Sequence, residues 1–123
     1  MKGNWVDAIR HYRAGLRAGP DWVPLVRRAA WLLATCQDAT IRHAADAVSL
    51  AERAVRLSGG NDAESLDALA AAQAELGHFA DAVRTGRRAL ALARTGKRDA
   101  LSRDLAARIA LYESGKPFRL VRP

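Results

Sequence analysis

The stretch that decides the fold spans residues 63–96 and reads AESLDALAAAQAELGHFADAVRTGRRALALARTG. Its first half carries a regular set of side chains at helical spacing, namely Leu66, Leu69, Gln73 and Leu76. Gly77 interrupts this pattern, and the helical period resumes in the second half with Ala82, Val83, Ala89, Leu90 and Leu92. Because glycine commonly ends a helix, the pattern predicts two helices joined by a tight turn.

The same stretch carries small residues and a glycine–aromatic turn at fixed positions. Gly77-His78-Phe79 forms the turn, and the small or apolar positions are Ala70, Ala82, Ala89 and Leu90. In these features the stretch resembles the tetratricopeptide repeat, a helix–turn–helix unit of about 34 residues. It departs from that motif where Trp, Tyr, a second aromatic residue and Pro are usual; those positions hold Leu66, Gln73, Gly86 and Arg94.

The repeat pattern recurs elsewhere in the chain of 123 residues. We expect one all-α domain built from repeats. It consists of a half repeat (3–20), a repeat with a long inter-helix loop (22–60), a full repeat (63–96), a capping helix (98–114) and an extended tail (115–123). The resemblance implies that about six helices form a right-handed α–α superhelix, a solenoid in which each hairpin packs on the next.

The half repeat over residues 3–20 carries an apolar stripe that includes Trp5, Ile9 and Tyr12. In a stack of helical hairpins, such a stripe packs against helices on both sides. The sequence provides a helix for only one side. We therefore expect that the chain is the C-terminal part of a longer protein, or that Trp5, Ile9 and Tyr12 form an edge for self-association as a homodimer.

Two longer strings extend the resemblance. Residues 29–55, AAWLLATCQDATIRHAADAVSLAERAV, and residues 105–119, LAARIALYESGKPFR, are similar to the C-terminal repeat block of bacterial proteins with many tetratricopeptide repeats. This resemblance implies a protein-interaction scaffold without chemistry of its own, and it names no partner. The chain has no run of about 18 apolar residues and no signal-peptide core, so we expect no membrane span and a soluble protein, cytoplasmic rather than exported.

The resemblance also implies that the first helices of successive repeats line a groove for a peptide or helix of a partner protein. In this register the groove residues are Arg27, Arg28, Trp31, Glu64, Asp67, Ala71 and Glu75. Trp31 suits a binding anchor, yet it equally suits packing between helices. Arg27 and Asp67 could also pair with each other across adjacent helices. A clamp for a terminal carboxylate is not expected, because the groove helix over residues 61–76 carries acids and no base.

The balance of charge is basic, with 20 lysines and arginines against 13 acids and a formal net charge of +7. Such a balance favours acidic partners such as acidic peptides, nucleic acid or lipid headgroups. An alternative function is therefore nucleic-acid binding along a basic stripe formed by Arg10, Arg13, Arg17, Arg84, Arg87, Arg88, Arg94, Lys97 and Arg98. Between Arg56 and Arg84, however, the chain carries acids and no lysine or arginine.

Residues that could carry chemistry are scattered along the chain. His11, His43 and His78 lie far apart in the sequence, and none has a partner at the spacing of a metal site or a catalytic pair. Cys36 is the single cysteine, which excludes an intrachain disulfide and a multi-cysteine zinc site. We therefore expect no enzymatic activity, no metal and no cofactor.

Overall fold

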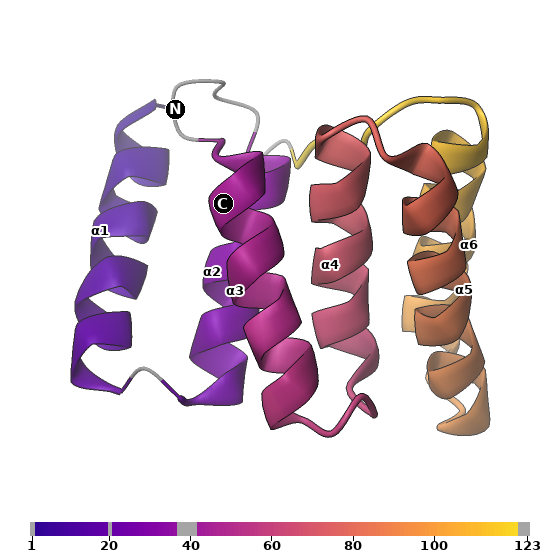
Figure 1. Ribbon diagram of the computed structural model, residues 1–123, viewed down its shortest axis with the longest axis horizontal. Helices are drawn as coiled ribbons and strands as arrows, with labels where there is room; N and C mark the ends of the chain where they lie inside the picture. Colours follow the sequence, from indigo (N-terminus) through magenta and orange to yellow (C-terminus); the bar gives the residue numbers. More distant parts are fainter. Residues whose placement is uncertain (1, 20, 37–41, 121–123) are drawn as a thin grey trace.

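The computed structural model describes residues 2–19, 21–36 and 42–120, with side chains from residue 7 onward. All regular structure in these residues is helical (Figure 1). In chain order the helices are α1 (Lys2–Ala18), α2 (Val23–Thr35), α3 (Ala44–Leu57), α4 (Ala63–Glu75), α5 (Phe79–Thr95) and α6 (Asp99–Glu113). The all-α prediction is confirmed, and the helices lie where the apolar periods of the sequence placed them.

The helices form an open array. Each packs mainly on its neighbours in the sequence, and α2 also packs on α4. They stand side by side in Figure 1, with α1 at one end and the pair α5 and α6 at the other. Among the described residues α1 and α6 make no extensive contact, so the helices do not close into a bundle. A stack of this kind buries apolar surface between neighbours and leaves its long faces accessible.

The core is a chain of apolar clusters that passes from one helix pair to the next. One cluster joins Ile9 of α1 to Leu33 of α2, and another joins Leu66 of α4 to residues of α5 and α6. The approach of α6 to α5 is especially close at Gly86, where an added Cβ would lie 2.9 Å from Cγ1 of Ile109. The absence of a side chain at Gly86 therefore allows the close contact between these two helices.

Helix α4 is covered on most sides. Ten of its residues are buried: Ala63, Ser65, Leu66, Asp67, Ala68, Leu69, Ala70, Ala71, Ala72 and Ala74. The small side chains let α2, α3 and α5 approach it. Because burial removes polar groups from water, the acidic side chains of this segment need partners from neighbouring elements. That requirement organises the site described below.

The helices α3 to α6 share one kind of C-terminal turn. A backbone N–H beyond the helix returns to a carbonyl near its end, as His78 does to Gln73 and Arg98 does to Ala93. The residue before each donor adopts a positive φ, and these residues are Gly59, Gly77, Lys97 and Gly115. Glycine takes this conformation at no steric cost, whereas Lys97, at φ 56°, carries a side chain there.

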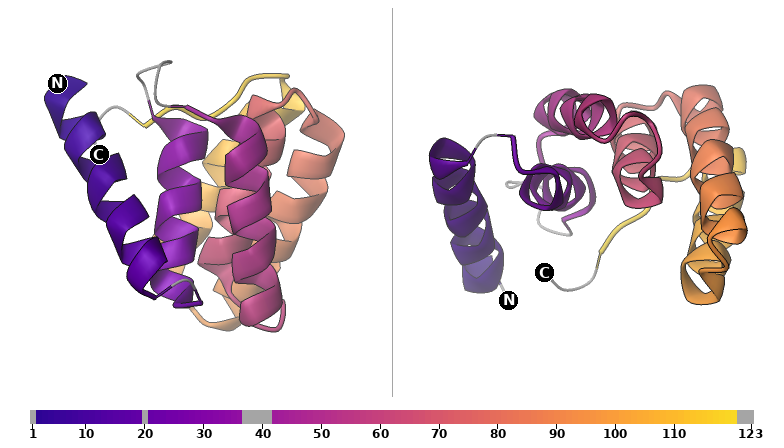
Figure 2. Two further views of the ribbon diagram at one scale, coloured as in Figure 1. Left: turned by 60° about the vertical axis from the view of Figure 1, so that its left-hand side comes forward. Right: turned by 90° about the horizontal axis from the view of Figure 1, so that it is seen from below.

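The tail beyond α6 turns back over the molecule. Figure 2 shows it leaving α6 and returning to α2 across the face formed by α2, α4 and α6. At its far end the N–H of Leu120 donates to the carbonyl of Thr35 at 2.7 Å, and Leu120 forms an isolated parallel bridge with Cys36. Residues 116–119 of the tail form no helix, and the return of the tail to α2 was not foreseen.

Candidate functional site

The candidate site is a cavity of about 290 Å³ on the face formed by α2, α4 and α6, which we call the inner face. It is open to solvent and is lined by Pro24, Arg27, Arg28, Trp31, Glu64, Asp67, Leu101 and Arg108. Five of the predicted groove residues thus lie together around one cavity. Trp31 was expected to be either a binding anchor or a packing residue between helices, and it has both positions in part. It lines the cavity, and it also packs against the core clusters.

Helical spacing explains how these side chains meet. Pro24, Arg28 and Trp31 follow one another at intervals of three or four, so they share one face of α2. Glu64 and Asp67 share a face of α4 for the same reason. Each helix therefore presents a row of side chains to the cavity, and the packing of α2 on α4 brings two rows side by side.

Arginines from other elements surround the acids of α4 and its N-terminus. Arg27 lies 2.9 Å from Asp62 and 3.7 Å from Glu64, so it pairs with these acids and not with Asp67 as the sequence suggested. The partner of Asp67 is Arg108 of α6, whose Nη1 donates to Oδ2 at 2.6 Å. The acidic surface expected along α4 is therefore largely compensated by neighbouring helices.

Arg108 contacts two aromatic rings that also contact each other. Its guanidinium carbon is 4.7 Å from the ring centre of Trp31 and 4.7 Å from that of Phe118 in the tail. The two rings are themselves 5.5 Å apart, centre to centre. A guanidinium that contacts aromatic faces is stabilised electrostatically, and the pair with Asp67 fixes its position further. Trp31 is thus held by a cation on the inner face as well as by the core.

Burial controls the protonation of Asp67. Removal from water raises the pKa of this carboxyl to about 7, although the charge of Arg108 acts in the opposite direction. Among the described residues its Oδ1 accepts no hydrogen bond, and the buried hydroxyl of Tyr112 makes none either. The pKa of Tyr112 is raised by burial and by the nearby charge of Asp67. At the base of the cavity, burial therefore disfavours the ionised forms of both Asp67 and Tyr112.

Asp62, at the start of α4, behaves differently. Burial alone would raise its pKa, but hydrogen bonds from Ser65 and Arg27 outweigh this effect and hold the pKa below its ordinary value. Asp62 is therefore a firmly ionised partner for Arg27. The two acids lie on one segment of the chain, yet their surroundings shift their pKa values in opposite directions.

Two of the predicted groove residues do not line the cavity. Ala71 is only 2% exposed, so the chain itself covers it. Glu75 lies further along α4, where it contacts Arg42 and accepts two hydrogen bonds from Arg119 of the tail. Glu75 thus belongs to a part of the inner face that the tail occupies.

Arg28 is the arginine of the cavity with the most accessible charge. It is exposed, and its Nε donates to the hydroxyl of Tyr12 at 3.3 Å. Within the described part of the chain, no carboxylate lies within ion-pair distance of Arg28. Arg28 can therefore receive an acidic or carbonyl group of a ligand without first losing an ion pair.

The predicted self-association edge is only partly accessible. Ile9 is 8% exposed and belongs to the core, so it does not form an open edge. Tyr12 is half-buried and lines a second cavity, of about 340 Å³, between α1, α2 and α3. The side chain of Trp5 lies outside the described residues. The apolar stripe of α1 thus faces α2 in large part.

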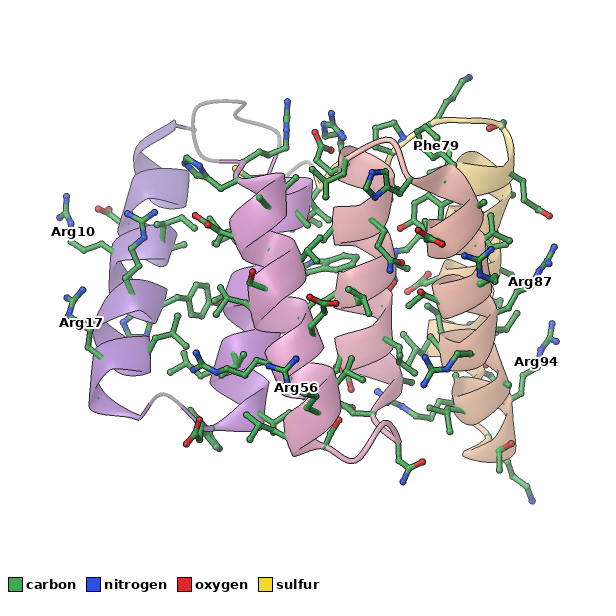
Figure 3. All side chains as sticks on the ribbon, in the orientation of Figure 1. Arg10, Arg17, Arg56, Phe79, Arg87 and Arg94 are labelled. Atoms are coloured by element: carbon green, nitrogen blue, oxygen red, sulfur yellow. The ribbon has the colours of Figure 1, made fainter. Side chains whose placement is uncertain are left out.

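The arginines considered for nucleic-acid binding do not form one stripe. In Figure 3, Arg10 and Arg17 project from α1 at one end of the array, whereas Arg87 and Arg94 project from α5 at the other. All four are exposed. Several members of the set are also paired with acids; these are Arg10, Arg84, Arg87 and Arg98. The basic charge is therefore divided between the two ends.

Residues that could carry chemistry remain separate. His11, His43 and His78 are exposed and belong to different elements, and Cys36 is buried. The described ranges contain no group of three or more potential metal ligands and no helix long and apolar enough to cross a membrane.

No protein-family model matches the chain, and no curated protein matches it either. Function must therefore be inferred from the inner face itself.

The sequence did not identify three residues that shape the site. Arg108, Phe118 and Arg119 come from α6 and the tail, more than 40 positions away from the residues that they contact on α4. Gly115 and Pro117 indicated that the helix ends before them. Nothing in the local pattern indicated that the tail returns to α2, because that return depends on long-range packing.

Proposed function

We propose that this chain is a non-catalytic scaffold of the tetratricopeptide type, which binds a peptide or helix of a partner protein on its inner face. The open array of helix pairs and the glycine–aromatic turn at Gly77-His78-Phe79 support the family resemblance. The proposal for binding depends on the inner face alone and would hold for any helical array with this surface.

One observation carries the proposal: an open cavity of about 290 Å³ has an aromatic anchor beside Arg28, which no acid among the described residues neutralises. Trp31 offers a ring that is already held in place by Arg108, so little side-chain entropy is lost on binding. Trp and Arg are the residue types that most often dominate the binding energy of protein interfaces.

The lining of the cavity indicates the chemistry of the ligand. Pro24, Trp31 and Leu101 provide apolar surface, and Arg28 provides a donor fork for a carboxylate or carbonyl. An apolar side chain followed by an acidic residue fits this arrangement. The other charged residues around the cavity are already paired, so they favour such a ligand mainly by fixing the shape of the site.

The test is a selection of displayed random peptides on the full chain, followed by binding measurements with three variants. Arg28→Glu and Trp31→Ala should weaken the selected peptides by about 30-fold, as expected for a hot spot worth about 2 kcal/mol. Arg94→Glu is the matched control, because Arg94 is exposed on α5, far from the cavity. Peptides that bind all three variants as tightly as the wild type would contradict the proposal.

A further inference from the structure

The tail of this chain lies on the inner face as an extended peptide. Gly115 ends α6 with φ 74°, and Pro117 cannot continue a helix because it lacks a backbone N–H. The segment then crosses the inner face toward α2 (Figure 2). Its backbone joins α2 through the hydrogen bond from Leu120 to Thr35. A groove that holds an extended segment by its backbone and successive side chains is a usual form of peptide recognition.

Three successive side chains of the tail meet three different surfaces. Phe118 contacts the ring of Trp31 and the guanidinium of Arg108. Arg119 places both of its terminal nitrogens against the carboxylate of Glu75, with Nη2 at 3.1 Å from Oε1.

The third residue, Leu120, packs against an apolar cluster that includes Leu33 and Cys36. These surfaces of Trp31, Arg108, Glu75 and the end of α2 form what we call the tail site.

Each of these surfaces selects a different kind of side chain. The faces of Trp31 and Arg108 suit an aromatic ring. The carboxylate of Glu75 suits a planar guanidinium, because it accepts both donors of the fork at once. The cluster around Leu33 suits an aliphatic side chain. The tail site therefore selects an aromatic residue, an arginine and an aliphatic residue in succession.

The tail site is continuous with the open cavity. Trp31 and Arg108 line the cavity and also contact Phe118. A partner peptide longer than the tail could therefore occupy both regions, whereas the described residues of the tail do not line the cavity. The additional contacts would offset the advantage that the tail gains from its covalent link to α6.

We propose, as a consequence of the proposed function, that the partner enters the tail site as an extended peptide with an aromatic–arginine–aliphatic triplet. The chain's own Phe118-Arg119-Leu120 holds this site and is displaced by the partner. The tail is thus an internal competitor whose sequence matches the ligand that the site accepts.

The experiment uses the full chain and the synthetic peptide SGKPFRL, which corresponds to residues 114–120. Phe118→Ala combined with Arg119→Ala removes the side chains that hold the tail, and it should leave the site vacant. We expect this released variant to bind the labelled peptide at least about tenfold more tightly than the wild type, because a short link gives the tail an effective concentration on the order of millimolar. Fluorescence anisotropy measures both affinities.

Two controls define the chemistry of binding. A peptide with both Phe and Arg replaced by Ala should not bind the released variant. Adding Glu75→Gln to that variant should weaken the original peptide by about tenfold or more, because the guanidinium loses its charged acceptor. If the released variant loses helical content, Arg119→Glu replaces it, since this change breaks the pair with Glu75, adds repulsion between two carboxylates and leaves Phe118 unchanged.

Three results would overturn the inference. The peptide could bind the released variant no better than the wild type, or the alanine peptide could bind equally well. Alternatively, the wild-type mass could double with concentration and lose this doubling in Arg119→Glu, which would assign the site to the tail of a second copy. If only the tail-peptide experiment fails and the selected peptides still depend on Trp31, the proposed function stands. If both experiments fail, both proposals are overturned.

Discussion

The protonation of Asp67 gives the sharpest test of the electrostatics on the inner face. Burial raises the pKa of this carboxyl to about 7 in the folded chain, against an ordinary value of 3.8. Because the folded-state pKa is the higher one, Asp67 contributes stability that is fully present below about pH 4 and is lost as the pH rises through about 7. The structural cause is the position of Asp67 beneath the cavity, where its Oδ1 accepts no hydrogen bond from the described residues.

The size of the effect follows from the two pKa values. Between about pH 5.5 and about pH 8, the contribution of Asp67 to the free energy of unfolding should fall by about 2 kcal/mol. Urea denaturation of the wild type and of Asp67→Asn at both pH values measures it. The asparagine can still accept a hydrogen bond from Arg108 and does not titrate, so the wild-type stability relative to the variant should fall by about this amount.

Asp62→Asn is the matched control. The pKa of Asp62 is held below its ordinary value, so this group is ionised in both states throughout the same pH range. The difference in stability between the wild type and Asp62→Asn should therefore stay constant between the two pH values. The difference in stability between the wild type and Asp67→Asn could instead be equally constant. The charge of Arg108 would then outweigh burial, and the raised pKa of Asp67 would be refuted.

Three further outcomes are expected. Gly86→Ala should lower the free energy of unfolding by about 1 kcal/mol in urea denaturation, because the clash of its Cβ with Ile109 exceeds the gain in helix propensity; an increase would show that α6 yields freely. Lys97→Gly should raise the same quantity by about 0.5–1 kcal/mol, since φ is positive there, and no gain would contradict the assigned turn. Phe118→Ala should speed hydrogen exchange of the Leu120 amide by about tenfold, whereas an unprotected Leu120 in the wild type would show that the tail is undocked.

The local sequence pattern was sufficient to predict the helices and about half of the residues at the site. The period of apolar residues and the glycine at Gly77 fix where helices begin and end, because those rules act within a few residues of the chain. The register of the repeat that the sequence resembles placed Arg28 and Trp31 on one groove helix, and Glu64 and Asp67 on the next. The structure brings these four residues to one cavity.

The partners of these residues could not be predicted in the same way. Arg27 and Asp67 seemed able to pair because their helices are adjacent, yet Arg27 pairs with Asp62, and Arg108 approaches Asp67 from α6. Which of several arginines reaches a given acid depends on distances set by packing, and the period of a helix does not contain them. The tail is the extreme case, since its docking combines contacts with α2, α4 and α6.

The pairing of charges also decides how a ligand of the inner face should respond to salt. Five arginines lie within ion-pair distance of the four acids of the α4 segment: Arg27, Arg42, Arg98, Arg108 and Arg119. Little net charge is left to attract a ligand from a distance, apart from Arg28. A peptide held by Trp31 should therefore bind with a weak dependence on salt, because apolar burial is not screened. Nucleic acid would instead use the arginines at the two ends, and its affinity would fall steeply with salt through counterion release. A salt titration of each ligand thus separates the two functions by the surface that each one requires.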